Sequence, residues 1–380
     1  MIRILNKKTR KTASLVIIGL FHLTAYAQTE DASQGKYAMN LAKRTLAKYD
    51  KNKDRKLQKA EDEKTWLQYK QLDSDKDEAL SLQELMKSTS GYLTIPNKKI
   101  INVLYKSVNG KDLYLDIYYP SDRAVSEKLP VVFYTHGGGW AAGSRHGITK
   151  ASFAAVAQQL LAKGFCVIPI SYRLVKKGGG SYMRDCVIDA KDAMRYIAKN
   201  ATKYGVNPKR FFSFGDSAGG HIAQMLLLSA SQDLLGEEAL ADYSYTMVAG
   251  VSWYGPCDFE KMSLFNHDDR PNFRDRFGAR IVGDDIQEGE KLLRYREMSP
   301  INYLKAQSPP LLMIQGDKDT TIPVKHAYYM KEKAKNIGAP VEVVIVNNAG
   351  HNWRKVKHDI KPTRNDIIQK TVDFLVSHKL

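Results

Sequence analysis

The chain has 380 residues, of which 43% are hydrophobic and 26% are charged, the balance of a soluble globular protein. Its formal net charge is +17. The lysines are spread along the chain, and no basic segment with interleaved aromatic residues occurs, which argues against a nucleic-acid-binding protein. The charge instead favours contact with an anionic polymer or an envelope surface.

Residues 1–27 have the organisation of a secretory signal peptide. Five basic side chains and no acidic ones precede or flank the apolar run 13–23, and Ala25-Tyr26-Ala27 follows it directly. The run is too short to span a bilayer comfortably. We therefore predict cleavage after Ala27 and a secreted or periplasmic protein without a transmembrane anchor. Its net charge would be near 17 − 5 = +12.

Two segments within the polar region 37–93 repeat each other 23 residues apart. Both carry oxygen-bearing side chains at positions 1, 3, 5, 9 and 12 and a leucine at position 8. This pattern resembles a pair of EF-hand calcium loops, in which position 7 contributes its main-chain carbonyl and the last glutamate binds through both oxygens. The calcium ligands that the resemblance implies are Asp50, Asn52, Asp54, Lys56 and Glu61 in the first loop, and Asp73, Asp75, Asp77, Ala79 and Glu84 in the second.

Position 6 departs from the calcium-loop pattern, because Arg55 and Glu78 stand where glycine is usual. A side chain at positive φ costs on the order of 1 kcal/mol, so we expect a Kd of roughly 10⁻⁴ to 10⁻³ M, which is useful outside the cell. A solvated charged helix face is the alternative reading. The region could also dock a protein partner.

After a linker at 91–97, residues 95–380 predict one α/β domain. Asn109-Gly110 joins an antiparallel opening pair, 103–108 and 113–119. Apolar strands then alternate with helices, which predicts a mostly parallel sheet covered on both faces. The further strands are expected at 131–134, 166–170, 210–214, 247–253, 311–314 and 341–346, and the helices at 151–162, 183–199, 220–230, 324–335 and 364–377.

The strand at 210–214 leads into Gly215-Asp-Ser217-Ala-Gly219, with a helix-forming segment behind it. Small neighbours allow the backbones to approach a serine held in a strained strand-to-helix turn, where its hydroxyl is exposed at a helix N-terminus. This spacing predicts a nucleophilic Ser217. Alone the motif is weak, because flexible loops produce it too.

Three further features follow predicted strands and complete the chemistry. His136-Gly-Gly-Gly-Trp140 offers main-chain N–H groups for an oxyanion hole, although a glycine run can be merely a flexible loop. Asp317 and Asp319 follow a second strand, and Gly350-His351 follows a third. The chain order serine, aspartate, histidine is the one expected for this architecture.

Together these motifs resemble the carboxylesterase type of α/β-hydrolase over residues 95–380. The glycine motifs are similar to hormone-sensitive-lipase-like esterases, and Trp253-Tyr254-Gly255-Pro256 is similar to bacterial feruloyl and acetyl-xylan esterases. The resemblance implies the triad Ser217, Asp319 and His351. It places the oxyanion donors at Gly138, Gly139 and Ala218. Gln315 stands where the family usually has histidine, a departure that we expect to leave the triad untouched.

The implied reaction is acyl transfer to Ser217 without a catalytic metal. An aromatic insertion at about 257–298 should shape the substrate pocket, although ordinary packing is the expectation for each single aromatic residue. These residues are Phe259, Phe265, Phe273, Phe277 and Tyr295. With three cysteines, at most one disulfide can form.

Three function classes remain open from the sequence. A secreted serine carboxylesterase acting on short acyl esters, with acetyl or feruloyl groups on polysaccharide as candidate substrates, accounts for the motifs and the leader. A serine peptidase of the prolyl-oligopeptidase type has a similar triad but usually carries a propeller, which is missing here. A calcium-dependent binding protein with an incidental hydrolase domain is the third.

Overall fold

The structure is a computed structural model that describes residues 39, 42–43, 45–63, 66, 70–87, 98–121, 128–176, 179–271, 273–283 and 287–379. The predicted signal peptide and its cleavage site lie outside these residues, as does most of the predicted linker. The chain divides into two compact units, Met1–Tyr92 and Leu93–Leu380, and each is described by itself.

The first unit contains the two predicted acidic loops, residues 50–61 and 73–84. Strand β1 (Lys56–Gln58) pairs with β2 (Ala79–Ser81) in antiparallel register, with Leu57 opposite Leu80. A 3-10 helix η1 (Lys70–Leu72) precedes the second loop, and helix α3 (Leu82–Lys87) follows its strand. Leu57 and Leu80 are fully buried in a small core with Trp66 and Leu85. The leucine at position 8 of each loop therefore joins the two loops.

The second unit is built on an eight-stranded sheet of order β10-β9-β8-β7-β5-β6-β4-β3. The hairpin β3–β4 is antiparallel, and β4 also pairs antiparallel with β6, whereas all other neighbours are parallel. The sheet is thus mixed but mostly parallel. Its strands are β3 (Lys99–Val108), β4 (Lys111–Tyr118), β5 (Leu129–Thr135), β6 (Cys166–Ile170), β7 (Val206–Asp216), β8 (Met247–Trp253), β9 (Leu311–Gly316) and β10 (Val341–Val346).

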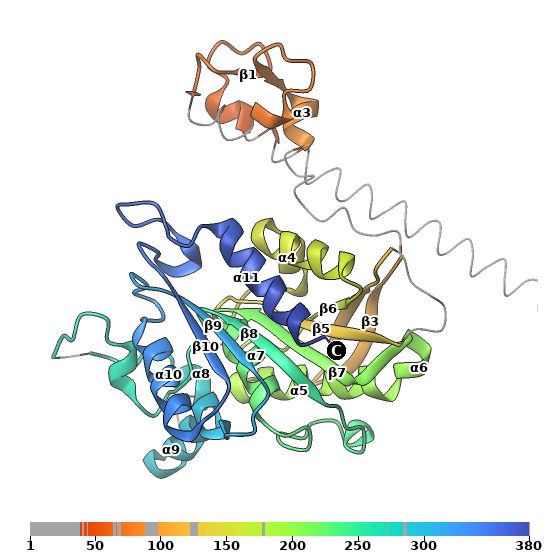
Figure 1. Cartoon of the computed structure of the whole chain (residues 1–380), viewed down its shortest axis with the longest axis vertical. Helices are drawn as coiled ribbons and strands as arrows, with labels where there is room; N and C mark the ends of the chain where they lie inside the picture. The colour runs from red at the N-terminus through yellow and green to blue at the C-terminus, as the bar shows by residue number, and fades with distance from the viewer. Residues whose placement is uncertain are drawn as a thin grey trace, which may run out of the picture. The chain divides into compact units, whose positions relative to one another are not determined.

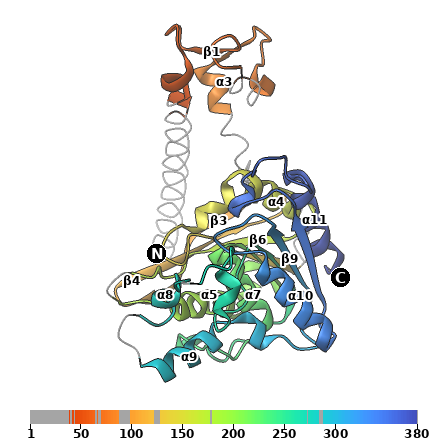
Figure 2. The ribbon, with the colours of Figure 1, turned by 90° about the vertical axis from the view of Figure 1, so that its left-hand side faces the viewer.

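Helices cover both faces of this sheet (Figure 1 and Figure 2). One hydrophobic core packs α5 (Met183–Lys199) and α7 (Ala218–Leu228) against the strands. A second core, on the other face, holds α4 (Ala151–Ala162) and α11 (Arg364–Ser377). Helix α10 (Lys325–Ile337) packs with β9 and β10 in a third cluster. Within the described residues, no helix is long and apolar enough to cross a membrane.

The expected strands and helices of the α/β unit form within a few residues of their predicted bounds. Strand β7 begins earlier, at Val206, because this residue already pairs with Leu129 of β5; the register then shifts, and Val131 pairs with Phe211. The insertion contains α8 (Gly278–Val282) and α9 (Glu288–Glu297), which the sequence did not predict. A short helix α6 (Ala201–Tyr204) follows α5.

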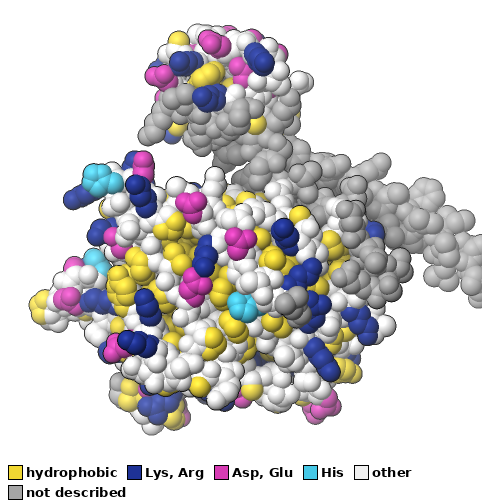
Figure 3. Space-filling view, in the orientation of Figure 1, with side chains coloured by type: hydrophobic (Ala, Val, Ile, Leu, Met, Phe, Trp, Pro, Cys, Tyr) yellow, Lys and Arg dark blue, Asp and Glu magenta, His cyan; other side chains and the backbone are white. Residues whose placement is uncertain are grey.

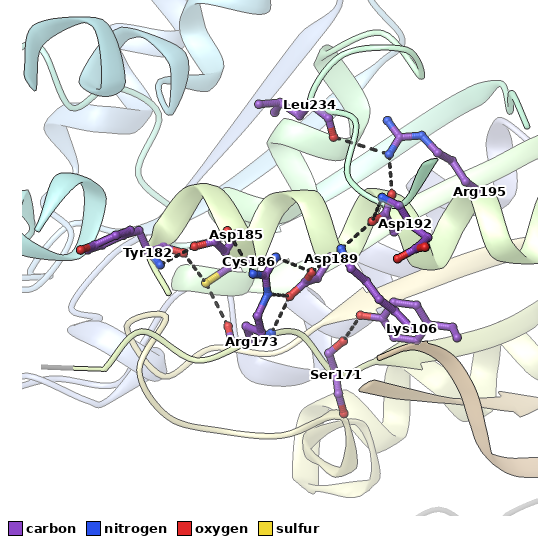
Figure 4. Close-up of polar contacts among 12 residues, drawn as sticks. Lys106, Ser171, Arg173, Tyr182, Asp185, Cys186, Asp189, Asp192, Arg195 and Leu234 are labelled. Atoms are coloured by element: carbon purple, nitrogen blue, oxygen red, sulfur yellow. Dashed lines mark hydrogen bonds and ion pairs between the residues drawn. The ribbon is translucent and has the colours of Figure 1, made fainter. Parts of the chain in front are cut away.

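A buried network of charges ties β3 to α5 (Figure 4). The Lys106 ammonium of β3 lies 2.9 Å from the Asp189 carboxylate and 2.7 Å from that of Asp192. Asp189 also accepts hydrogen bonds from the main-chain N–H and the guanidinium of Arg173, and Asp192 pairs with Arg195. Because both aspartates are fully buried, each needs these cations to compensate for its lost hydration.

On one face of the described residues, the positive charge is dispersed. On the face shown in Figure 3, Lys and Arg side chains are scattered among hydrophobic, acidic and uncharged surface. The expectation that nucleic acid is not a partner remains a prediction.

Candidate active site

Ser217 lies at the junction of β7 and α7, at the carboxyl edge of the sheet. Its backbone is strained, with φ of 53° and ψ of −118°. Its N–H donates to the Trp253 carbonyl of the neighbouring strand at 2.8 Å. A Cβ at Gly215 would lie 2.2 Å from the Gly219 carbonyl oxygen, and one at Gly219 would lie 2.0 Å from that of Thr135. Only glycine fits on either side, as the spacing predicts.

The structure brings His351 and Asp319 to Ser217. His351 lies in the 3-10 helix η7 (His351–Trp353), after β10, and its Nε2 is 3.0 Å from the Ser217 Oγ. Its Nδ1 is 2.7 Å from Asp319 Oδ2. The other carboxylate oxygen accepts the N–H groups of Thr321 and Ile322. Asp319 is buried while Ser217 and His351 are partly exposed, so the nucleophile can meet substrate and the acid is fixed.

Asp317, the other aspartate after β9, points elsewhere. One carboxylate oxygen accepts the Ala349 N–H at 3.3 Å, and the other lies 3.2 Å from the Lys318 ammonium. Gln315 differs from our expectation, because its Nε2 donates to Asp319 Oδ2 at 3.1 Å and to the Ile322 carbonyl. Gln315 therefore does contact the triad, because its side chain extends from the end of β9 toward the loop that carries Asp319.

The glycine run follows β5 and lies beside the elbow. Gly138 and Gly139 have φ of 121° and 59°, and a Cβ at Gly138 would lie 2.1 Å from the Ala142 carbonyl oxygen. Ala218 is the first residue of α7. Among the described residues, none of these three N–H groups donates to a protein acceptor. They are available to an oxyanion, and the helix N-terminus adds a favourable dipole.

Asp216, inside the serine motif, is a site residue that the sequence analysis missed. Its buried carboxylate accepts the Tyr134 hydroxyl at 3.0 Å and the Gly137 N–H at 2.9 Å. Burial raises the pKa of Asp216 to about 6, although both hydrogen bonds oppose this shift. The side chain thus links the nucleophile turn to the first peptide of the oxyanion loop. Its place next to the serine was the only available signal.

His221, one turn into α7, holds the other end of that loop. Its Nδ1 accepts the Trp140 indole N–H at 3.2 Å, so Nε2 carries the proton and donates to the Met298 carbonyl at 2.7 Å. Burial lowers the pKa of His221 to about 4, which keeps the ring neutral. Its position four residues after the nucleophile could have suggested a contact, but not the partner.

The aromatic residues of the insertion mainly fill space, as expected for each singly. Phe259, Phe265, Phe277 and Tyr295 are buried in the core that contains Trp140, and Phe273 packs against it. All three cysteines of the chain, Cys166, Cys186 and Cys257, are free thiols in buried positions.

In the first unit, the second acidic loop gathers carboxylates. Oxygen atoms of Asp73, Asp75 and Glu84 lie within 4.8 Å of one another. Asp73 Oδ1 is buried and has no hydrogen-bond partner among the residues that the structure describes, an arrangement that suits a cation. Lys56 of the first loop reaches across to Asp77 at 2.5 Å. Ala79 lies in β2, at position 7 of this loop.

The first acidic loop is held together by its own main chain. Asp50 accepts the N–H groups of Lys53 and Arg55, Asn52 accepts that of Asp54, and Asp54 accepts that of Lys56. Glu61 accepts three main-chain N–H groups of the same loop. At position 6, Arg55 and Glu78 have φ of 70° and 60°, the conformation for which glycine was expected.

The fold is that of an α/β-hydrolase, and its site brings Ser217, His351 and Asp319 together in one chain of hydrogen bonds. Comparison with known proteins gives the family. The BD-FAE family model matches residues 115–334, more than half of the chain, and the chain belongs to this family.

The chain is also similar to curated esterases and to solved structures of the α/β-hydrolase fold. The chain is 26% identical over 271 residues to isoprenylcysteine alpha-carbonyl methylesterase ICME of Arabidopsis thaliana, covering 69% of this chain and 58% of that protein. It is 28% identical over 240 residues to esterase LipC of Mycobacterium tuberculosis, covering 63% and 56%. The chain thus spans little more than half the length of these relatives. Apo Thermogutta terrifontis esterase 2 matches with a TM-score of 0.58 and 23% identity over 74% of this chain and 95% of that one.

The two aspartates after β9 can be distinguished by mutation. We expect Asp319→Asn to lower kcat by about 10⁴, because the amide favours the wrong tautomer of His351. Asp317→Asn should cost far less, because the described polar contacts of this side chain are with Ala349 and Lys318 and not with the triad. Steady-state hydrolysis of 4-nitrophenyl acetate by both variants measures the difference. A larger loss in Asp317→Asn would show that the acid is misassigned.

Asp216 should make the stability of the fold depend on pH. Its pKa is raised by burial from the ordinary value to about 6, so the folded state retains a proton that the unfolded chain loses near pH 4. The contribution of Asp216 to stability is therefore full at low pH and is lost as the pH rises through 6. Relative to Asp216→Asn, the free energy of unfolding of the wild type should fall by roughly 2 kcal/mol between pH 4 and 7.5. Urea titrations of both proteins measure this, and parallel pH profiles would contradict the assignment.

Proposed function

We propose that this protein is a serine carboxylesterase that hydrolyses short-chain acyl esters. The observation that carries the proposal is the Ser217, His351 and Asp319 chain of hydrogen bonds, at 3.0 and 2.7 Å, beside three main-chain N–H groups that have no protein acceptor within the described part of the chain. A nucleophile, a base oriented by an acid, and an oxyanion site are the parts that acyl transfer requires.

In the proposed mechanism, His351 Nε2 takes the proton of Ser217 as its Oγ attacks the ester carbonyl. Asp319 holds the imidazole through Nδ1 and stabilises its charged form. The N–H groups of Gly138, Gly139 and Ala218 receive the developing oxyanion, and one such donor is worth roughly 2.7 to 4 kcal/mol. The proton then passes to the leaving alcohol, and water repeats the sequence to release the acid from the acyl-enzyme.

Family membership and similar proteins support ester substrates with short acyl groups. Curated relatives include esterases and methylesterases, and Thermogutta terrifontis esterase 2 has been solved with butyrate and with propionate bound. We further propose acetyl or feruloyl groups on polysaccharide as the natural substrates and a secreted or periplasmic location. Both rest on the sequence motifs and on the signal-peptide pattern of residues 1–27.

The experiment is a panel of 4-nitrophenyl esters from acetate to decanoate, acetylated and feruloylated oligosaccharides, and a proline peptide. We expect fastest turnover with acetate to butyrate and loss of ester hydrolysis in Ser217→Ala, which keeps the turn but lacks a nucleophile. Circular dichroism checks that the variant folds. Near wild-type hydrolysis by Ser217→Ala, or cleavage of the peptide in preference to esters, would refute the esterase assignment. Faster turnover of decanoate would refute the short-chain preference.

We also propose that the two acidic loops bind calcium as a structural ion. The convergence of Asp73, Asp75 and Glu84, with the unpartnered Asp73 oxygen, favours the second loop. There, the Asp77 side chain and the Ala79 carbonyl would complete an oxygen shell. In the first loop, Asp50, Asn52, Asp54, Glu61 and the Lys56 carbonyl would hold the ion. The same region is the one that we propose could dock a protein partner.

Calcium should stabilise the first unit without entering the reaction, because every proposed ligand lies outside residues 93–380. Between saturation at a hundredfold Kd and chelation, we expect a loss of about 2.7 kcal/mol in the stability of residues 37–93, seen by hydrogen exchange. Glu61→Gln with Glu84→Gln should have the same effect, and Glu63→Gln, outside the ligand positions, should not. Calorimetry without binding at millimolar calcium would refute the sites, and loss of kcat on chelation would refute their separation from catalysis.

A further inference from the structure

Arg280, on helix α8 of the insertion, lies against the oxyanion loop. Its Nη1 donates to the Gly139 carbonyl at 3.0 Å. A Cβ at Gly139 would lie only 2.4 Å from the same nitrogen. Gly139 is also one of the three proposed oxyanion donors. The guanidinium therefore lies on the peptide next to the place where an ester carbonyl would bind.

Arg276, four residues earlier, reaches the loop that carries the acid. Its Nη2 donates to the carbonyls of Thr320 and Thr321, at 3.1 and 2.9 Å, immediately after Asp319. A single short segment thus places one cation on the oxyanion loop and another on the acid loop.

Neither charge is neutralised by the protein among the residues described. Three other arginines of the insertion have a carboxylate partner at about 3 Å. They are Arg270 with Asp268, Arg294 with Glu297, and Arg296 with Glu260. Arg276 and Arg280 instead bond main-chain carbonyls, and no carboxylate in the described part of the chain lies within ion-pair distance of either.

An arginine that binds a carbonyl through one nitrogen keeps further N–H donors in a planar fork that suits a carboxylate. Arg280 is partly exposed, and Gly138 beside it is exposed, so the fork can be reached from solvent at the catalytic edge. Unpaired cations at such an edge attract anionic ligands.

We infer that Arg280, assisted by Arg276, forms an anion subsite that favours esters carrying a carboxylate close to the scissile carbonyl. This inference rests on the proposed esterase function and names its substrate class. An ester can carry this carboxylate on its acyl part or on its alcohol part, and different probes distinguish the two.

A purely structural role for Arg280 makes a different prediction. If the guanidinium only orients the Gly139 peptide, its loss should slow neutral and anionic esters by the same factor. If the guanidinium binds the substrate carboxylate, its loss should lower kcat/KM for the anionic ester and leave that of the neutral ester unchanged. Matched ester pairs therefore distinguish the two roles.

The acyl arm compares 4-nitrophenyl hydrogen succinate with its methyl ester, and the alcohol arm compares 4-acetoxybenzoate with methyl 4-acetoxybenzoate. In at least one arm we expect kcat/KM to be about tenfold higher for the carboxylate, the size of one charge-assisted hydrogen bond. Arg280→Gln should abolish this preference and Arg280→Lys should keep part of it. Arg270→Gln, in the same insertion but paired with Asp268, should leave it unchanged. The preference should also shrink in about 0.5 M salt, because salt screens the attraction between the guanidinium and the carboxylate.

Equal turnover within both pairs would overturn the inference, as would an equal loss for neutral and charged esters in a folded Arg280→Gln. Failure of the wild type on the neutral esters would count instead against the esterase proposal. The subsite can be tested without turnover by calorimetry of 4-acetoxybenzoate and of 4-nitrophenyl hydrogen succinate binding to Ser217→Ala. If neither carboxylate binds more tightly than its methyl ester, or if the difference survives Arg280→Gln, the subsite is excluded.

Discussion

The close approach of three backbones at Ser217 is the constraint on which the site depends. The turn can form only because Gly215 and Gly219 let β7, α7 and the end of β5 touch without intervening side chains. That contact fixes the nucleophile relative to the glycine loop, since the loop begins where β5 ends. The strain in the Ser217 backbone is maintained by the parallel strands on either side, which cannot shift independently.

The carboxyl edge of the sheet explains why residues so distant in sequence meet. Strands β5, β7, β8, β9 and β10 run parallel, so the loops that follow them open on the same side. Ser217, Asp319 and His351 follow β7, β9 and β10 in that order. The rigid sheet places each loop, and short main-chain bonds, such as those from Thr321 and Ile322 to Asp319, set the final side-chain orientation.

Much of this could be predicted from the sequence because its signals are local. Apolar runs and turn residues gave the strands and helices, and motif spacing gave the triad candidates. Other contacts depend on distances that only the folded chain defines. The pairing of Lys106 with Asp189 joins residues 83 positions apart, and Arg280 meets Gly139 across 141 positions. No periodicity marks such pairs, and a charged residue in an amphipathic pattern is usually solvated. The helices of the insertion were missed because they are short and weakly apolar.

These long-range contacts converge on the oxyanion loop. Asp216 binds the Gly137 N–H, His221 binds the Trp140 indole, and the Trp140 carbonyl accepts the Val175 N–H. Val175 lies two residues after Arg173, and Arg173 is held by the buried Asp189 of α5. The charge network therefore helps to fix the loop. Donors that are already fixed need no reorganisation when charge develops on the substrate, which is the source of most oxyanion stabilisation. Buried charges contribute little net stability because they lose their hydration. Here they hold the loop rigid, which is what fixed oxyanion donors require.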